Sequence, residues 1–269
     1  FNKTLLMSSY HLSDQTIPDY IRALEQWQPT YIDSYPSAIG EIARYINEHA
    51  VAHRIAPDFI LTSSETLTET QREDIRRAFN NTRIIDHFGC SEMAVSAYTR
   101  ADNRYLIEPL YALVDFAPLD NSSSTSLLCT GLLNMAMPLL RYQIGDTVED
   151  GRAGLGPAYA DRTFAAVAGR EDDLIITPDG RRIGRLDPAF KGLDGISRAQ
   201  IIQHSPEELQ VLVVPATGAD RAAVAHKLES NLQARTDPRM HIRIDFVDDI
   251  PLTKSGKFKS VISKIGRNG

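Results

Sequence analysis

Several kinds of feature are scarce in this sequence of 269 residues. Only two cysteines are present, Cys90 and Cys129, which argues against a disulfide framework and suits a reducing cytoplasm. No apolar run approaches the roughly 20 residues that a membrane-spanning helix needs. The formal net charge is −6, so the sequence lacks the basic character typical of nucleic-acid-binding proteins. These absences predict a cytoplasmic protein with no membrane span and no nucleic-acid partner.

Motifs of several common enzyme and metal-binding classes are missing as well. The seven histidines show no ligand spacing, and two cysteines 39 residues apart do not form a zinc site. No Gly-x-Ser-x-Gly segment is present, which argues against a serine hydrolase. We interpret Cys90 as an inert small residue rather than as a nucleophile.

The first 90 residues show alternating helical and strand patterns. Thr68 and Gln71 form a capping-box pattern at the start of one helix. The spacing of apolar residues predicts helices over Asp14–Trp27, Pro36–His49 and Thr68–Phe79, and buried strands over Phe59–Leu61 and Arg83–Asp86. Such alternation is typical of a parallel α/β sheet.

The pattern changes after residue 105. Short predicted strands at Tyr111–Phe116, Ser126–Cys129, Leu139–Tyr142 and Phe164–Val167 indicate an antiparallel sheet or a distorted barrel. Further strands flank an amphipathic helix from Asp220 to about Ala234, as in a small α+β domain. The fold class is therefore α/β, with a partial parallel sheet, an antiparallel sheet or barrel, and an α+β end. We place the domain boundary at Gly169–Asp173, which gives domains 1–171 and 172–269.

Phe88-Gly89-Cys90-Ser91-Glu92 directly follows a predicted strand. It would lie at the carboxyl end of a parallel sheet, where open α/β folds bind their ligands. Gly89 lets the backbone approach a ligand closely, Phe88 could stack on a purine, and Glu92 suits Mg²⁺ that is shared with phosphates. Taken alone, a strand-end turn with a solvated glutamate is the simpler interpretation.

Two more segments place charged residues at predicted turns. Met137–Asp146 would end a strand at Gly145-Asp146, where an aspartate could accept both hydroxyls of a ribose, although Gly-Asp alone is only a turn signal. Gly169–Asp173 sets Arg170 beside three acids. Arg170 could face ribose or phosphate with Asp172 as a hinge, or the cluster could be a solvated ion-pair group at a linker.

Lys257 closes the segment Pro251-Leu252-Thr253-Lys254-Ser255-Gly256-Lys257. The phosphate-loop pattern fails here, because Pro251 stands where a glycine is required and Phe258 replaces the Ser/Thr after the lysine. The neighbouring Gly256 makes a mobile arm with one point charge, which suits a cation that must enter and leave a site. A basic tail that is merely solvated is the alternative.

The order and spacing of these four segments resemble the adenylate-forming superfamily, which includes acyl-CoA synthetases, luciferases and the adenylation domains of peptide synthetases. The likeness is greatest to phenylacetate–CoA ligase-like proteins, including a branch linked to capsular polysaccharide biosynthesis. It extends over nearly the whole chain. Tyr35-Pro36-Ser37 and Ser63-Ser64-Glu65 resemble pocket-lining loops of that branch.

The resemblance implies a role for each candidate residue. Lys257 would bridge the attacking carboxylate and the α-phosphate of ATP, and Glu92 would hold Mg²⁺ and take part in catalysis. Asp172 would be the hinge. The nucleotide would be bound by Phe88, Gly89, Ser91, Asp146 and Arg170, and the acid pocket would be lined by Tyr35, Pro36, Ser64 and Glu65.

The resemblance also implies a reaction. A small carboxylic acid, aryl or short acyl, would be activated by ATP to an acyl-adenylate and transferred to a thiol, with ATP, Mg²⁺ and coenzyme A as cofactors. A cation between two anions offsets their repulsion and stabilises the transition state. The C-terminal domain would be a mobile lid that swings about Asp172 and withdraws Lys257 before the second step.

One element of the family pattern is absent. The family carries a Ser/Thr/Gly-rich loop with a lysine that grips the β- and γ-phosphates, and no segment of residues 1–80 resembles it. The chain also opens with Phe1. We therefore expect it to be the C-terminal part of a larger protein, and expect this part alone to bind ATP poorly and turn over little. Adenylation with transfer to an amine or sugar hydroxyl, and a catalytically silent nucleotide-binding module, are the alternatives.

Overall fold

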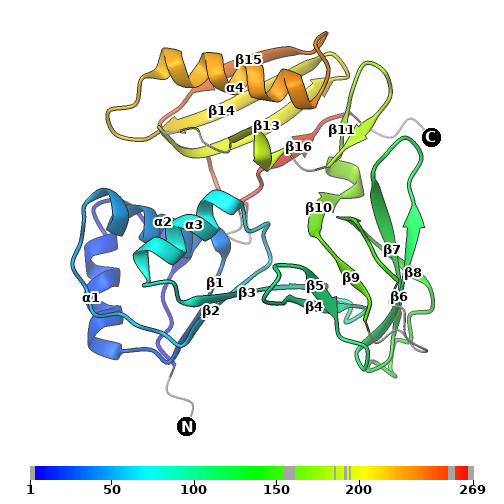
Figure 1. Cartoon of the computed structure of the whole chain (residues 1–269), viewed down its shortest axis with the longest axis horizontal. Coiled ribbons are helices and arrows are strands. Elements are labelled where there is room, and N and C mark those ends of the chain that lie inside the picture. The colour runs from blue at the N-terminus through cyan, green and yellow to red at the C-terminus, as the bar shows by residue number, and fades with distance from the viewer. Residues whose placement is uncertain are drawn as a thin grey trace. The chain divides into compact units, whose positions relative to one another are not determined.

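A computed structural model describes residues 4–153, 161–184, 186–190, 193, 195–253 and 258–265. The chain forms two compact units (Figure 1). The first consists of Phe1–His87 and Leu252–Phe258, and the second of Phe88–Pro251 and Lys259–Gly269. The domain boundary predicted at residues 171/172 lies inside the second unit and stays a prediction.

The first unit is built from a parallel sheet and three helices, as the alternating pattern predicts. Ile32, Ile60 and Ile84 are paired across its three strands. The buried side chains of the helices and the central strand form one apolar cluster that includes Ile60 and Phe79. The elements are η1 (Ser9–His11), α1 (Ile17–Trp27), β1 (Tyr31–Ser34), α2 (Pro36–Glu48), β2 (Phe59–Ser63), α3 (Glu69–Ala78) and β3 (Arg83–Gly89).

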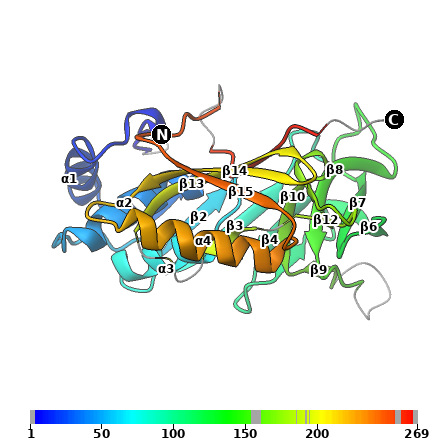
Figure 2. The same ribbon diagram turned by 90° about the horizontal axis from the view of Figure 1, so that it is seen from above.

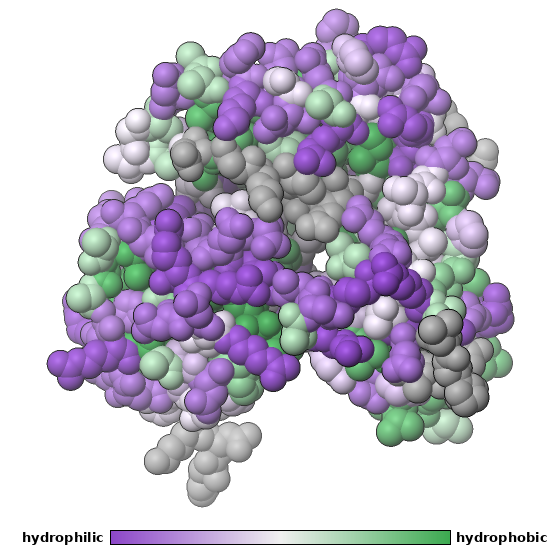
Figure 3. All heavy atoms as spheres, in the orientation of Figure 1, coloured by the Kyte–Doolittle hydropathy of each residue, from purple (hydrophilic) through white to green (hydrophobic). Residues whose placement is uncertain are grey.

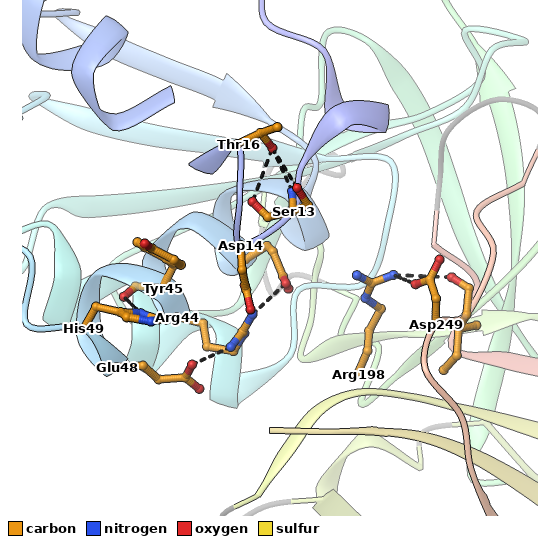
Figure 4. Close-up of polar contacts among 11 residues, drawn as sticks. Ser13, Asp14, Thr16, Arg44, Tyr45, Glu48, His49, Arg198 and Asp249 are labelled. Atoms are coloured by element: carbon orange, nitrogen blue, oxygen red, sulfur yellow. Dashed lines mark hydrogen bonds and ion pairs between the residues drawn. The ribbon is translucent and has the colours of Figure 1, made fainter. Parts of the chain in front are cut away.

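Local hydrogen bonds explain where these helices begin. The predicted capping box is confirmed at α3: the Gln71 N–H donates to the Thr68 hydroxyl at 3.2 Å, and the Thr68 N–H donates to Gln71 Oε1 at 3.0 Å. Before α1, Ser13 and Thr16 form a hydrogen-bonded turn, so the helix starts at Ile17, later than the sequence predicts (Figure 4).

Arg44 connects α2 to that same turn. Its guanidinium lies 3.4 Å from Asp14 and 2.7 Å from Glu41, and it also pairs with Glu48 (Figure 4). The Arg44 side chain is 15% exposed, so these pairs are partly desolvated. They fix the segment before α1 against the outer face of α2.

The second unit contains two groups of antiparallel strands between residues 96 and 170, as the short-strand pattern predicts. One has the strand order β4 (Ser96–Thr99), β5 (Tyr105–Ile107), β9 (Thr163–Phe164). The other has the order β10 (Ala166–Arg170), β8 (Tyr142–Glu149), β7 (Ser124–Gly131), β6 (Ala112–Pro118). Both contribute to one core, in which Val114, Leu127, Val148 and Phe164 are fully buried.

One predicted strand in this region is wrong. Leu139–Arg141 is not part of a strand; β8 begins at Tyr142 and continues through Gly145 and Asp146 to Glu149. The chain turns at Arg141, whose φ is +48° and whose N–H donates to the Thr130 hydroxyl at 3.0 Å. Gly145-Asp146 therefore lies inside β8 instead of closing a strand.

The remaining residues form the predicted α+β part. Its sheet has the order β15 (His241–Phe246), β14 (Glu208–Pro215), β13 (Ile196–Ser205), β16 (Val261–Ser263), with an antiparallel central pair and parallel outer pairs. Helix α4 (Arg221–Arg235) lies along one face of this sheet (Figures 1 and 2), and Leu228 and Leu232 pack with Val211. A short hairpin, β11 (Ile175–Ile176) and β12 (Arg182–Ile183), turns at Gly180, and the short helices are η2 (Glu171–Asp173) and η3 (Asp187–Phe190).

One face of this part is largely polar (Figure 3). Hydrophilic side chains predominate over α4 on the face drawn in Figure 3. Among the described residues, no helix has the length and apolar character needed to cross a membrane.

Candidate functional site

Glu92 and Asp146 lie close enough to influence each other electrostatically. Glu92 follows the end of β3 by three residues, and Asp146 lies in β8. Burial raises the pKa of the Asp146 carboxyl; Arg170 opposes the shift, and the negative charge of Glu92 adds to it. The side chain of Asp146 is only 15% exposed. Two segments that the sequence separates by more than 50 residues thus place their carboxylates within electrostatic range of each other.

Arg170 is placed opposite Asp146 by strand pairing. The two residues are partners in the antiparallel β10–β8 register, and Arg170 Nε lies 3.8 Å from Asp146 Oδ1. Gly145 makes room for this arrangement, because a Cβ at that position would lie 3.1 Å from Arg170 Nη2. Its φ of +79° is also a conformation that favours glycine. A β-bulge between Val167 and Gly169 sets the register of Arg170.

Phe88 makes an aromatic contact with a buried ring. Its ring meets that of Phe164 in an edge-to-face arrangement at 5.7 Å, and Phe164 stacks on Tyr105 at 4.7 Å. Phe88 is half-buried, whereas Gly89 and Ser91, which follow it, are exposed. The ring that the sequence assigns to adenine stacking therefore packs against one buried aromatic ring and has partial access to solvent.

The environment of the Cys90 thiol, which lies beside these groups in the sequence, disfavours its reactive thiolate form. Burial raises the pKa of Cys90, and the neighbouring Glu92 adds to the shift. Cys129 is fully buried, which raises its pKa to about 12. Because the thiolate is the reactive form, both side chains are poor nucleophiles at neutral pH, which supports the interpretation of Cys90 as inert.

The segment after Arg170 is fixed by polar contacts that sequence reasoning did not identify. Gln143 Nε2 donates to Glu171 at 2.7 Å, and Lys259 Nζ lies 2.8 Å from Asp173. Asp172 lies in η2 between these two acids, but its side chain is outside the described residues. The only sequence signal for Lys259 is its place in the basic tail, two residues after Lys257. Lys257 itself, with Ser255 and Gly256, is outside the described residues.

The four predicted pocket residues lie in the first unit. Pro36 is buried at the first position of α2, Tyr35 precedes it and is half-buried, and Ser64 is exposed with a φ of +71°. The carboxylate of Glu65 accepts two backbone hydrogen bonds, from the N–H of Ser37 at 2.9 Å and from the N–H of Phe258 at 2.6 Å. The structure thus brings Tyr35, Pro36 and Glu65 together at the start of α2, and their role in a pocket stays a prediction.

The residues present suit a metal that is shared with a ligand better than a metal held by protein alone. Among the described residues, no group of three or more His, Cys, Asp or Glu could hold a metal ion. Mg²⁺ at nucleotide sites is commonly held by one or two carboxylates together with phosphate oxygens. Glu92 is the predicted metal ligand, and that role stays a prediction.

Solved structures with a similar fold identify the architecture. A 2-hydroxyisobutyryl-CoA ligase in the postadenylation state matches with a TM-score of 0.71 and 16% identity, over 94% of this chain and 58% of the ligase. The anthranilate CoA ligase AuaEII, in complex with anthranoyl-AMP, matches with a TM-score of 0.63 and 13% identity, over 91% of this chain and 51% of that one. The chain has the adenylate-forming ligase fold.

The sequence comparisons agree with that fold. Residues 175–264 match the family model of the CapK C-terminal domain. Protein CapK of Staphylococcus aureus is 27% identical over 265 residues, which cover 97% of this chain and 59% of CapK. The chain thus spans about three fifths of the length of that relative. These matches agree with the resemblance inferred from the four motifs.

Proposed function

We propose that this chain belongs to an enzyme that activates a small carboxylic acid with ATP and passes the acyl group to a thiol. The observation that carries the proposal is the environment of Asp146. Its carboxylate is largely buried, its Oδ1 lies 3.8 Å from Arg170 Nε, and the negative charge of Glu92 helps to raise its pKa. Perturbed acids with specific charged neighbours are typical of functional sites. The adenylate-forming ligase fold supports the same assignment.

Each described group has a role in nucleotide binding under this proposal. Asp146 accepts hydrogen bonds from both ribose hydroxyls, and a carboxylate with two oxygens suits that pair. Arg170, across the strand pair, contacts ribose or phosphate as a planar donor. Phe88 stacks on adenine and also contacts Phe164. Gly89 and Ser91 are exposed backbone positions that the nucleotide can approach.

Glu92 provides the hard oxygen ligand for Mg²⁺. The ion would neutralise phosphate charge and draw electron density from the α-phosphorus. Lys257 binds the acid carboxylate and an α-phosphate oxygen, which lowers the repulsion between two anions. A carboxylate oxygen then attacks the α-phosphorus, the bond to the bridging oxygen breaks, and pyrophosphate leaves with its electron pair. The C-terminal part, residues 172–269, turns about Asp172 before the thiol attacks the acyl carbon and AMP leaves.

Coenzyme A is the proposed acceptor, and aryl or short acyl acids are the proposed substrates. Two of the structural neighbours are CoA ligases for a hydroxyisobutyryl and an anthranoyl group. The amide bond synthetase McbA from Marinactinospora thermotolerans has the same fold, with a TM-score of 0.64 and 14% identity. Transfer to an amine is therefore the second candidate, with a sugar hydroxyl as a further alternative acceptor.

Carboxylate-dependent exchange of pyrophosphate into ATP tests the proposal. The intact gene product is assayed against a panel of aryl and short alkyl acids, and product formation with and without coenzyme A then identifies the acceptor. Lys257→Ala is expected to abolish exchange and leave ATP binding nearly unchanged. Lys264→Ala, which removes an exposed lysine of the same basic tail, should retain exchange and serves as the matched control.

Two results would contradict the assignment. Exchange that persists in the Lys257→Ala variant would remove the proposed role of that lysine. ATP binding without exchange for any acid of the panel would favour the silent nucleotide-binding module. Residues 1–269 alone are expected to show little exchange, and full activity from this chain would overturn that expectation.

A further inference from the structure

The ion pair between Arg170 and Asp146 is too weak to fix the arginine by itself. Arg170 Nε lies 3.8 Å from Asp146 Oδ1, which is longer than a hydrogen bond, and the Arg170 side chain is 58% exposed. An ion pair with such an exposed member contributes little, because water screens the charge and a long side chain must be ordered. Other contacts must therefore hold the guanidinium opposite Asp146.

Thr147 holds the residue directly before Arg170. It follows Asp146 in β8 and is fully buried, and its hydroxyl donates to the Gly169 carbonyl at 3.0 Å. Gly169 ends the β-bulge of β10 and has a φ of +113°. A β-bulge interrupts the regular pairing of two strands and changes the direction of the side chains beside it. The hydroxyl thus fixes the backbone of β10 where it leaves the bulge and leads into Arg170.

Gln143 holds the residue directly after Arg170. It lies in β8, and its Nε2 donates to Glu171 Oε2 at 2.7 Å and to the Ser126 hydroxyl at 3.2 Å. Ser126 belongs to β7 and is buried, so the amide is itself attached to the sheet. The Glu171 side chain is only 10% exposed. A hydrogen bond to a carboxylate that is shielded from water is stronger than one between neutral groups in solvent.

We propose that Thr147 and Gln143 are positioning residues, which hold Arg170 opposite Asp146 by fixing the residues on both sides of it. Both belong to β8, so the strand that carries the carboxylate also determines where the guanidinium lies. They would act through Arg170 and not by touching the nucleotide. The inference rests on the proposed function only for the role of Arg170 in nucleotide binding, and the positioning itself does not depend on it.

An NMR titration of the Asp146 carboxyl in residues 1–269 tests the positioning without any ligand. Arg170 opposes the raised pKa of Asp146, so a displaced guanidinium should raise that pKa further. Thr147→Val replaces the hydroxyl by a methyl group of similar size, and Gln143→Ala removes the amide; each is expected to raise the pKa of Asp146. Thr147→Ser keeps a hydroxyl and should restore the original value.

The same substitutions in an Arg170→Ala background show whether the effect passes through the arginine. Without the guanidinium, neither Thr147→Val nor Gln143→Ala should change the pKa of Asp146 any further. Equal changes in both backgrounds would mean that the substitutions act on Asp146 by another route, and would overturn the proposal. An unchanged or lowered pKa in the presence of Arg170 would overturn the role of whichever residue was substituted.

A matched control separates positioning from a general change in the sheet. Thr125→Val removes a hydroxyl that donates to the Val148 carbonyl at 3.4 Å, between β7 and β8, and should leave the titration of Asp146 unchanged. A shift as large as that in Thr147→Val would contradict the inference. Gln143 is exposed, so Gln143→Ala is expected to fold and decides the outcome if the buried Thr147→Val does not fold.

The consequence for the reaction is measured by ATP–pyrophosphate exchange in the intact gene product. Thr147→Val is expected to raise the KM for ATP roughly three- to tenfold, and to cause no further rise in the Arg170→Ala background. An unchanged KM together with a shifted Asp146 titration would support the positioning and refute the proposed role of Arg170. Active exchange with an unshifted titration would overturn the positioning and leave the proposed function standing, so the two failures give different results.

Discussion

Gly145→Ala tests how the backbone of β8 controls the pair formed by Asp146 and Arg170. Gly145 has a φ of +79°, and an added Cβ would lie 3.1 Å from Arg170 Nη2. Gly180 offers a matched control, because its φ is +81° and an added Cβ would meet nothing within 4 Å. The two substitutions therefore share the backbone strain and differ in the contact with Arg170.

The expected change in the free energy of unfolding follows from these geometries. A left-handed conformation costs an L-residue about 1–2 kcal/mol, and the smaller entropy of the unfolded chain offsets about 0.4–1 kcal/mol of that. Both variants should thus lose roughly 0–1.6 kcal/mol. The Arg170 side chain is 58% exposed and can move by a few tenths of an ångström, so the two losses should agree within about 0.5 kcal/mol.

The electrostatic consequence should appear only in Gly145→Ala. Arg170 opposes the raised pKa of Asp146, so displacing the guanidinium is expected to raise that pKa further, while Gly180→Ala leaves it unchanged. Urea titration followed by circular dichroism gives the stabilities, and an NMR titration of the Asp146 carboxyl gives the pKa. An unchanged Asp146 titration in Gly145→Ala would refute the claim that Gly145 is required for the placement of Arg170.

Two further predictions concern the surroundings of the site. Phe164 is fully buried and contacts both Phe88 and Tyr105, so Phe164→Ala should lower the free energy of unfolding by about 3–5 kcal/mol. Phe246 is half-buried, so Phe246→Ala should lower the free energy of unfolding by less in the same urea titration. Equal losses of stability in the two variants would contradict the burial argument. The raised pKa of Cys90 keeps its thiol protonated, so iodoacetamide should alkylate it more slowly at pH 8 than it alkylates free cysteine. The rate of this alkylation should increase as the pH is raised above 8. Cys129, with a pKa of about 12 and no exposure, should react only in urea, and rapid labelling of either thiol in the folded chain would contradict this prediction.

Much of the fold could be predicted where a local pattern determines the structure. Helices α2, α3 and α4 follow the 3.6-residue spacing of their buried side chains. The capping box at Thr68 depends only on residues three apart, and the parallel strands β2 and β3 are short apolar runs between helices. In each case the information lies within about a dozen residues.

Short strands without such a pattern were missed or misplaced. β1, β4, β5 and β16 have three or four residues each, too few for alternation to show. β8 was misplaced because Gly145, which resembles a turn residue, adopts a positive φ inside a strand. Gly145 can adopt this conformation inside the strand, and because it has no side chain it leaves room for Arg170.

The site could be predicted only as a set of residue types. The motifs gave Glu92, Asp146 and Arg170, but their proximity depends on the pairing of β8 with β10 and on the turn after β3. The contact between Glu65 and Phe258 joins residues 193 positions apart, and no local pattern encodes it. The pair of Lys259 and Asp173 is of the same kind.

Under the proposed function, a bound ligand would compensate the charge of Asp146. Its pKa in the folded chain is raised, so its contribution to stability is fully present below the pKa of the unfolded chain and is lost as the pH rises through the folded value. At neutral pH the ionised carboxylate is therefore a net cost to folding, despite the pairing with Arg170. An asparagine of the same size would avoid that cost. Hydroxyl donors or a cation bound beside Asp146 and Glu92 would offset it, which is the relation between stability and function expected of a binding site.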